Sequence, residues 1–381
     1  MSKVLFNKTT KVMIGLLAIL LCNSYVLSCV QDESWNPGEF AIYVFKVGQG
    51  DGQQIVSPAG KTLLIDVAEM SWNSKKGESL VADKLRQAMG DNFSHIDCVV
   101  ATHLHLDHIG YADKGGIWAL VEKNHFTIWR LIDRDSAEWI DFDEGGGFDP
   151  PEELYWNNAG TVPSTAIHWL TYVLDPSNKS KLHREVAKKG DKIQINLGGD
   201  VVIEIVQYDG LDAKIADGAT PVSGDHRGEN YLPSENDYSI TLKISYKELD
   251  YVSGGDTDGE YKISDFGYSY NDVESVIAPS IGEIEILHVN HQGSSHSSNQ
   301  RYLDTLKPTI SLISCGKNSY VHSDRGTLDR ILSISKIYLT EKGDPGRDYK
   351  SSIVVDGHIV IKSTDGINFT ANGDPFTIKQ D

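Results

Sequence analysis

One short run of residues limits what this chain can fold into: three histidines and an aspartate occupy six consecutive positions. The run is His103-x-His105-x-Asp107-His108, and it directly follows the apolar, strand-like stretch 96–101. Imidazole and carboxylate groups at this density suit a borderline divalent cation such as Zn²⁺. The chain has only 13 histidines in 381 residues, so a polar loop that is histidine-rich by chance is the weaker interpretation. The sequence therefore predicts a metal centre at the end of a strand.

Three more side chains with metal-binding chemistry stand at the ends of apolar stretches. Asp66 ends one such stretch, Asp256 follows another after two glycines, and His291 follows a third. Glycine lets the backbone approach closely at such a position. If these strand ends meet at one sheet edge, the side chains complete the predicted centre.

The alternation of strands and helices falls into two halves and predicts two sheets packed face to face with helices outside, an α/β αββα four-layer arrangement. Expected strands include 40–47, 53–56, 61–67 and 191–195, and expected helices include 78–89, 164–174 and 300–306. The domain is expected to span residues 38–381, with an insertion at about 133–180 that is rich in Trp, Asp, Gly and Pro.

In their order along the chain, these residues resemble the metallo-β-lactamase fold superfamily. The matching positions are Asp66, His103, His105, Asp107, His108, Asp256 and His291. Segments 47–52, 236–242, 291–296 and 316–322 look like the branch that includes the hydrolase domain of the competence protein ComEC. The resemblance implies an αββα sandwich with metals at one edge of its two sheets.

The resemblance also implies two metal ions, Zn²⁺ by default with Mn²⁺ or Fe as alternatives. The imidazoles of His103, His105 and His291 would hold one ion. Asp107 and His108 would hold the other, and the Asp256 carboxylate would bridge the two. Asp66 would orient a ligand without touching the metal. A metal-bound hydroxide would then attack an electrophilic phosphorus or carbonyl group.

Several roles are left open by the sequence. Most two-metal members have one further histidine between the motif and Asp256, for which Asp237 and His226 are the two candidates here. In the loop after a late strand, Asn318, Tyr320 and His322 are expected to contact the substrate, and His322 could donate a hydrogen bond or a proton.

Other conspicuous side chains are assigned to the core. Cys98 and Cys315 lie in apolar stretches and are expected to be buried free thiols. Tryptophan is usually largely buried, so a core position is preferred to a binding surface for Trp118, Trp129, Trp139, Trp156 and Trp169.

The amino terminus has the layout of a bacterial secretory signal. Residues 1–28 carry three lysines near their start, Lys3, Lys8 and Lys11. An apolar run of about ten residues follows, which is too short to span a bilayer comfortably. The next residue, Cys29, ends a lipobox-like sequence and is the expected lipid attachment site, followed by a linker to residue 37. The protein is therefore expected to be exported to the bacterial cell envelope, anchored to a membrane by lipid or else periplasmic or extracellular.

The charge of the chain limits its partners. The net charge of −19 becomes −22 once residues 1–28 and their three lysines are removed. Binding to long nucleic acids draws its affinity from neutralised phosphates, so this acidity disfavours it. The sequence predicts a metal-dependent phosphodiesterase acting on a small phosphoester or a short nucleic-acid end. The alternatives are a lactam or lactone hydrolase and a non-catalytic surface lipoprotein, and no protein partner is indicated.

Overall fold

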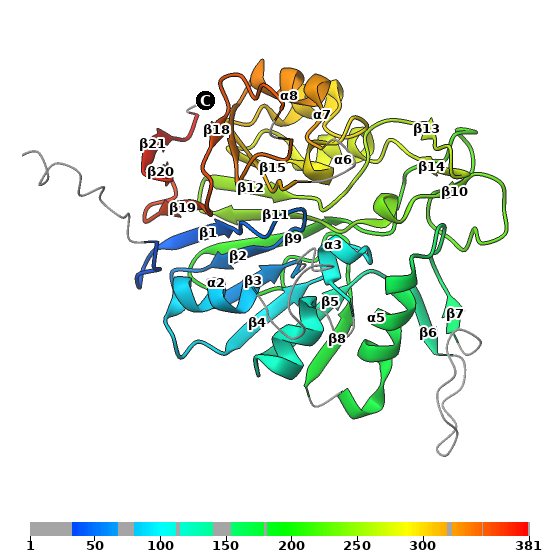
Figure 1. Ribbon diagram of the computed structural model, residues 1–381, viewed down its shortest axis with the longest axis horizontal. Helices are drawn as coiled ribbons and strands as arrows, with labels where there is room; N and C mark the ends of the chain where they lie inside the picture. Colours follow the sequence, from blue (N-terminus) through cyan, green and yellow to red (C-terminus); the bar gives the residue numbers. More distant parts are fainter. Residues whose placement is uncertain are drawn as a thin grey trace, which may run out of the picture. The chain divides into compact units, whose positions relative to one another are not determined.

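Two mixed β-sheets form the frame of the protein (Figure 1). The computed structural model describes residues 33–67, 80–111, 115–139, 154–178, 181–317, 322–344 and 346–379. In spatial order, the first sheet contains β21 (Asp374–Thr377), β20 (Asn368–Ala371), β19 (Ile359–Ser363), β1 (Phe40–Val44), β2 (Gln53–Val56), β3 (Thr62–Ile65), β4 (His95–Val100), β5 (Thr127–Asp133) and β8 (Leu182–Val186). The second contains β18 (Ile353–Val354), β17 (Lys336–Leu339), β16 (Ile310–Ile313), β15 (Ile286–His288), β12 (Leu249–Ser253), β11 (Thr241–Tyr246) and β9 (Val201–Gln207).

Smaller elements complete the fold. Two small sheets are formed by β10 (Leu232–Pro233), β14 (Tyr268–Tyr270) and β13 (Lys262–Ile263), and by β6 (Ala137–Trp139) and β7 (Leu154–Trp156). The helices are α2 (Leu80–Met89), α3 (Leu106–Ile109), α4 (Gly116–Trp118, continued by a π-helical turn at Ala119–Lys123), α5 (Ser164–Leu174), α6 (Glu274–Ile281), α7 (Gln300–Leu306) and α8 (Arg325–Leu332). Short 3₁₀ turns lie at Pro176–Asn178, Glu235–Tyr238 and Asn290–Gly293. Among the described residues, no helix has the length and apolar character needed to cross a bilayer.

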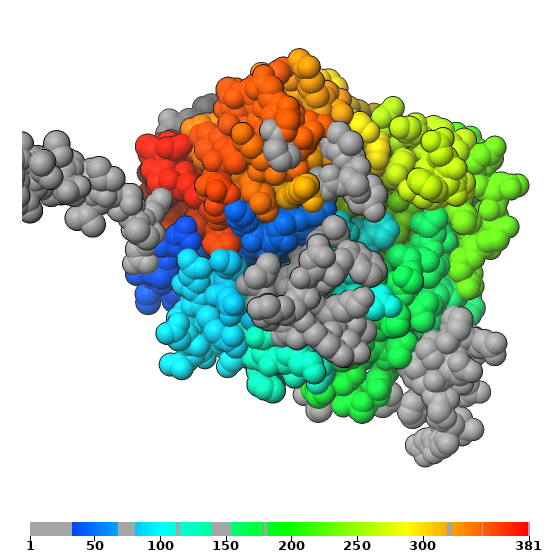
Figure 2. All heavy atoms as spheres, viewed as in Figure 1, coloured from blue at the N-terminus to red at the C-terminus, as the bar shows by residue number. Residues whose placement is uncertain are grey.

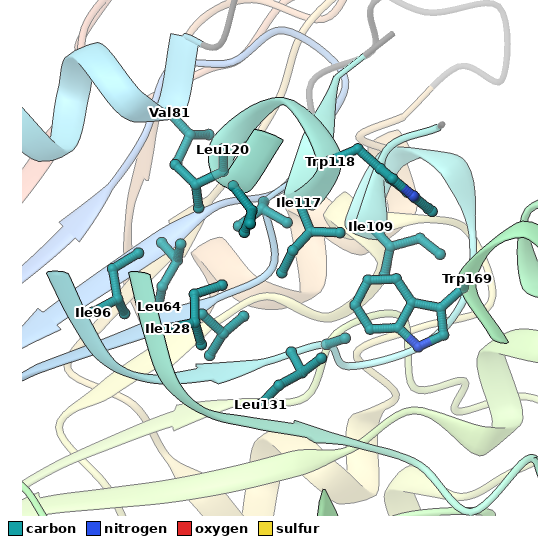
Figure 3. Close-up of a cluster of buried hydrophobic side chains, with 14 of the residues drawn as sticks. Leu64, Val81, Ile96, Ile109, Ile117, Trp118, Leu120, Ile128, Leu131 and Trp169 are labelled. Atoms are coloured by element: carbon teal, nitrogen blue, oxygen red, sulfur yellow. The ribbon is translucent and has the colours of Figure 1, made fainter. Parts of the chain in front are cut away.

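Three buried apolar clusters separate four layers. Successive side chains of a strand point to opposite faces, so in β1 Ile42 packs between the two sheets while Tyr43 packs on the helix side. Figure 3 shows part of the helix-side cluster of the first sheet, with Leu64 and Ile96 toward one side and Trp169 of α5 toward the other. A third cluster packs α6, α7 and α8 on the outer face of the second sheet. The expected αββα four-layer sandwich is confirmed.

The strand directions bring the predicted site residues to one edge. In the first sheet β3, β4 and β5 run parallel, and in the second β12, β15 and β16 run parallel. Polar loops beyond the carboxyl ends of parallel strands are the usual place for a ligand site. Asp66 follows β3, His103 follows β4, Asp256 follows β12 and His291 follows β15.

Most of the expected elements are confirmed to within a few residues, with β2 and α7 as clear examples. The expected strand at 191–195 is wrong. The Asp191 carboxylate accepts hydrogen bonds from the amides of Ile193 and Gln194 at 2.7 and 2.9 Å, which closes a turn, and the edge strand is β8 instead.

Part of the expected insertion at 133–180 belongs to the helix layer. Within it, α5 buries Trp169 completely, and the indole nitrogen of this residue donates to the Asp133 carboxylate at 2.8 Å. Trp118 and Trp156 are buried as expected, but Trp129 is 65% exposed, so its core assignment is wrong. The Trp139 side chain lies outside the described residues. Cys98 and Cys315 are confirmed as buried free thiols.

Candidate metal centre

The loop after β4 brings two imidazole rings of the motif against a third. His103 is fully buried, and its Nε2 lies 3.1 Å from Nδ1 of the half-buried His105, with the two rings nearly perpendicular. The His108 ring, on α3, lies 4.1 Å from that of His103. Burial, followed by the neighbouring imidazole of His108, lowers the pKa of His103 well below its usual range, so the ring is neutral and one of its nitrogens carries a lone pair. Such a ring can bind a cation.

A buried carboxylate orients His108. Asp66 Oδ2 lies 2.7 Å from Nδ1 of His108, and Asp66 also accepts hydrogen bonds from the Thr102 amide at 2.8 Å and the Thr102 hydroxyl at 2.7 Å. The Nδ1 bond to a carboxylate fixes the ring orientation and leaves Nε2 free to act as a ligand. The structure therefore places Asp66 behind His108, in the orienting position expected from the sequence.

Asp256 lies where the two halves of the fold meet. Its carboxylate oxygens lie 3.2 Å from Nε2 of His108, 3.8 Å from Nε2 of His103 and 3.6 Å from Nε2 of His291. The preceding Gly255 has φ +55°, and a Cβ there would lie 2.6 Å from the Thr102 hydroxyl. The turn that presents Asp256 therefore requires glycine.

His291 repeats the arrangement of His108 from the other sheet. Its Nδ1 lies 3.1 Å from Asp258 Oδ1, and the same oxygen lies 2.8 Å from Nδ1 of His296. The Nε2 of His291 thus faces Asp256. Burial opposes the charge on His291, but Asp256 and then Asp258 outweigh it and raise the pKa of the ring to about 9.

The charges of the centre favour a cation. Burial opposes charge on both His108 and Asp256, yet their attraction raises the pKa of His108 and lowers that of Asp256 well beyond the usual values. Two further buried carboxylates, Asp51 and Asp66, lie with His108 in a second close group. A dense set of buried carboxylates without equal positive charge attracts a metal ion.

Unpaired buried atoms fit the same interpretation. The His108 Nε2 and Asp256 Oδ1 atoms are buried and face each other at 3.2 Å, and neither makes a hydrogen bond. Buried polar atoms are almost always hydrogen-bonded, so two facing atoms without such a bond are available to a shared cation. The ligand atoms of His103, His108 and Asp256 lie within 4.8 Å of one another, and so do those of Asp258, His291 and His296. Their donor set fits Zn²⁺.

The remaining motif residue, Asp107, lies half-buried beside the second half of the site. Its Oδ2 accepts a hydrogen bond from the Gln292 side chain at 3.3 Å, and its backbone carbonyl accepts from the Asp51 amide at 2.9 Å. Gln292 in turn is hydrogen-bonded to Gln49. Asp107 therefore contacts the residue that follows His291, which places its carboxylate beside the second half of the site.

Neither candidate for the further ligand lies among the clustered groups. The Asp237 carboxylate is occupied by Asn271, through its amide at 2.9 Å and its side chain at 2.8 Å, and by the Ser234 amide at 3.0 Å. His226 lies 3.0 Å from Glu229 in a different loop. The neighbour of Asp237, Asn236, lies beside the clustered groups instead. Its Nδ2 is 3.3 Å from the His291 ring, and its Oδ1 is buried without a hydrogen bond.

His322 comes from the late loop and meets the centre from the side of the second sheet. Its ring lies 5.1 Å from that of His291. Burial, followed by the charge of His291, lowers the pKa of His322 to about 3, so its imidazole is neutral. Asn318, Tyr320 and the predicted lipid site Cys29 lie outside the described residues.

A buried ion-pair network holds the motif loop. Both Glu235 oxygens accept from Arg134, at 2.8 and 2.6 Å, and one also accepts from the Leu104 amide at 3.0 Å. Arg134 further donates to Asp209 at 3.0 Å. Leu104 lies between His103 and His105, so this network fixes the backbone that presents both rings.

Sequence reasoning missed several of these contributors. His296 stands five residues after His291 and ends a segment already singled out, whereas Asp258 stands two residues after Asp256 and outside those segments. Asp51 lay in one of them as well. No local pattern distinguished them from loop residues, because their roles depend on contacts between distant segments.

The chain has distant similarities to known proteins. No family model matches it. The ComE operon protein 3 of Bacillus subtilis is 20% identical over 353 residues, which are 89% of this chain and 36% of that protein, so the chain spans about a third of the relative's length. Among solved structures, a metal-dependent hydrolase of the β-lactamase superfamily is 11% identical with a TM-score of 0.42, covering 79% of this chain and 95% of that one. Unliganded yeast PDE1 is 10% identical with a TM-score of 0.36, covering 82% and 90%. At these levels the description of the fold rests on the chain's own sheets, and any activity must be proposed from its own side chains.

Proposed function

We propose that this protein is a metal-dependent hydrolase related to the metallo-β-lactamase fold superfamily, and that it cleaves a phosphodiester. One observation carries the proposal. Two imidazoles from different sheets, His108 and His291, are each bound at Nδ1 by a buried carboxylate and each direct Nε2 toward Asp256. An arrangement that only stabilised the fold would not need orphaned ligand atoms at its centre.

The residues would share the work as follows. His103, His105 and His291 would hold one cation, Asp107 and His108 a second, and Asp256 would lie between them. Divalent cations bound there would lower the pKa of water and neutralise charge that develops on the substrate. Zn²⁺ suits the imidazoles, while the number of carboxylates leaves Mn²⁺ and Fe as candidates.

The chain's own groups would position the substrate and handle protons. His322 is neutral, so it could accept or donate a hydrogen bond at a phosphate oxygen or at the leaving oxygen. Asn236 has a buried carbonyl oxygen without a partner beside His291 and could contact the same substrate. The preference for a phosphodiester over an amide comes from the segments that resemble the ComEC hydrolase branch, and the 20% identity to a ComE operon protein agrees with that resemblance.

The proposal is tested by a substrate panel with matched variants. The protein without residues 1–28 is assayed against a chromogenic phosphodiester and a chromogenic lactam, before and after metal removal and reloading. Asp256→Asn should abolish phosphodiester hydrolysis. The control is His95→Gln, because His95 is exposed at the opposite end of β4, and it should keep full activity.

Other outcomes would redirect or end the proposal. Cleavage of the lactam alone would favour the amide-hydrolase alternative. An Asp256→Asn variant indistinguishable from the wild type in every assay, with no metal bound to either, would leave only a non-catalytic surface protein.

The location is proposed from the amino-terminal sequence alone. Export and lipid attachment at Cys29 would tether the hydrolase to the cell envelope, where a small phosphoester or a short nucleic-acid end could reach it. Incorporation of a labelled fatty acid into the wild type, and its loss in Cys29→Ala, tests this part separately.

A further inference from the structure

The segment that presents His291 has a backbone conformation that needs support from outside. We call residues 290–299 the His291 loop. His291 and Gln292 have φ +50° with ψ +41° and +25°, and Ser298 has φ +52°. Residues with a Cβ rarely adopt this left-handed region, and they stay there only where the surrounding structure holds them. The position of the His291 ring therefore depends on what holds the two ends of its loop.

A single buried carboxylate holds both ends of the His291 loop. Glu274, in the first turn of α6, is fully buried. Its Oε1 accepts hydrogen bonds from the Asn290 side chain at 2.8 Å and from the Ser298 amide at 2.7 Å, and its Oε2 accepts from the Asn299 amide at 2.7 Å. Asn290 directly precedes His291, whereas the other two donors end the loop. The carboxylate therefore joins the beginning of the loop to its end.

The first turn of α6 also supports the carboxylate behind His291. The helix layer that contains α6 is yellow to orange near the top of Figure 2. The amides of Val273 and Glu274 both donate to the Asp258 backbone carbonyl, at 3.0 and 3.1 Å. The next residue, Gly259, is so close that a Cβ there would lie 2.0 Å from Glu274 Oε2. Because Asp258 binds Nδ1 of His291, α6 contacts both the loop that carries the imidazole and the carboxylate that orients it.

Glu274 is buried without a cation beside it. Among the residues that the structure describes, no Lys, Arg or His side chain forms an ion pair with its carboxylate. A buried carboxylate without a cationic partner costs free energy unless hydrogen bonds replace the lost water. All three of its described hydrogen bonds go to the His291 loop. The loop and the carboxylate therefore stabilise each other in this one arrangement.

We propose that Glu274 is a positioning residue of the metal centre, which holds the His291 ring with its Nε2 toward Asp256 by fixing both ends of the His291 loop. This inference rests on the metal centre of the proposed function and adds a determinant outside its ligands. Glu274 belongs to none of the clustered ligand groups, so it acts through the backbone of the loop and not on the metal. A carboxylate that only stabilised the helix layer would change the free energy of unfolding without changing metal affinity.

Two variants break the connection at different points. Glu274→Gln keeps the size of the side chain, but an amide has only one acceptor oxygen, so the Asn299 amide or the other two donors lose their partner. Loss of a group that orients a metal-binding histidine typically weakens metal affinity by about 10- to 100-fold. Because Glu274 acts through the loop, we expect the lower end, about tenfold. Asn290→Ala removes the hydrogen bond next to His291 and should have a similar effect, so the test continues if Glu274→Gln fails to fold.

The affinity for Zn²⁺ is measured on the protein without residues 1–28, by competition with a chromophoric chelator and with no substrate present. The matched control is Glu285→Gln. Glu285 stands directly before β15, at the opposite end of the strand from His291, and its carboxylate accepts a hydrogen bond from the Asp250 amide at 3.1 Å. This variant should keep the wild-type affinity. Circular dichroism confirms that the variants are folded.

A double-mutant cycle with His291→Ala separates positioning from a general weakening of the fold. Residues that act through one another are not additive, whereas independent residues are. If Glu274 acts through His291, Glu274→Gln should weaken Zn²⁺ binding about tenfold in the wild type but less than about twofold in His291→Ala. An equal loss in the two backgrounds would overturn the inference.

The outcomes separate this inference from the proposed function. Wild-type Zn²⁺ affinity in folded Glu274→Gln and Asn290→Ala would overturn the inference, as would an equal loss in Glu285→Gln. A protein that binds Zn²⁺ and satisfies the cycle, yet cleaves no phosphodiester, would uphold the role of Glu274 and contradict the proposed function. Phosphodiester cleavage with unchanged metal affinity in both variants would do the reverse.

Discussion

Replacement of Asp66 by asparagine tests how the centre is held together. Asp66 does not face Asp256. It binds His108 Nδ1 at 2.7 Å and accepts two hydrogen bonds from Thr102. The asparagine keeps the size of the side chain but removes the charge, so the ring loses the charged partner that holds its Nε2 toward Asp256.

The size of the effect follows from these contacts. Loss of a carboxylate behind a metal-binding histidine typically weakens metal affinity by about 10- to 100-fold. This corresponds to roughly 1.4–2.7 kcal/mol of binding free energy. The metal-free protein should also lose about 1.5–3 kcal/mol of stability, because a hydrogen bond to a charged group disappears in a buried site.

The assay is a competition titration of the metal against a chromophoric chelator, with urea unfolding of the metal-free protein in parallel. Asp97→Asn is the matched control. Asp97 also joins β3 to β4, by accepting from the Thr62 amide at 2.9 Å and the Thr62 hydroxyl at 3.3 Å, but at the far end of the strands. Metal affinity should fall in Asp66→Asn only. Wild-type affinity in Asp66→Asn, or an equal loss in Asp97→Asn, would refute the orienting role.

Three other predictions concern the surroundings of the centre. Glu235→Gln should lower the free energy of unfolding by about 3–5 kcal/mol, because the buried Arg134 guanidinium loses one of its negatively charged partners. Urea unfolding measures this change, and a loss below about 1 kcal/mol would contradict the prediction. His322→Ala should reduce kcat for the phosphodiester by about 10²- to 10⁴-fold while elemental analysis finds the metal content unchanged; loss of metal would instead make His322 a ligand. Burial raises the pKa of the Cys98 and Cys315 thiols, so in a protein that begins after Cys29 neither should react with a disulfide reagent at pH 8 until the protein is unfolded, and rapid labelling of the native form would contradict their burial.

The sequence predicted the layers and the strand ends at which the candidate ligands cluster, because both depend on local patterns. Apolar strands followed by Asp66, by His103 and by His291 are visible without any contact information, and parallel strands bring their ends together. The same local reasoning failed at 191–195, where the apolar residues resembled a strand but the Asp191 carboxylate caps a turn. It also missed α8, which begins after the N-cap Asp324.

The partners of the ligands could not be read from the sequence. Asp258 supports His291 across 33 positions, and Glu235 supports Leu104 across 131. Asp237 was a reasonable candidate ligand by position, yet Asn271 and Ser234 occupy its oxygens. Such assignments depend on which way a loop turns, and only the packed structure fixes that direction.

X-ray absorption at the zinc edge tests the central claim most directly. The mature protein is loaded with Zn²⁺, and the nearest ligand shell is measured in the wild type and in Asp256→Asn. We predict nitrogen and oxygen neighbours at about 2.0–2.2 Å with the outer scattering of several imidazole rings, and a weakened zinc signal in the variant. A sulfur shell near 2.3 Å, an oxygen-only shell without imidazole, or the same spectrum in both proteins would contradict a metal centre built on these histidines and Asp256.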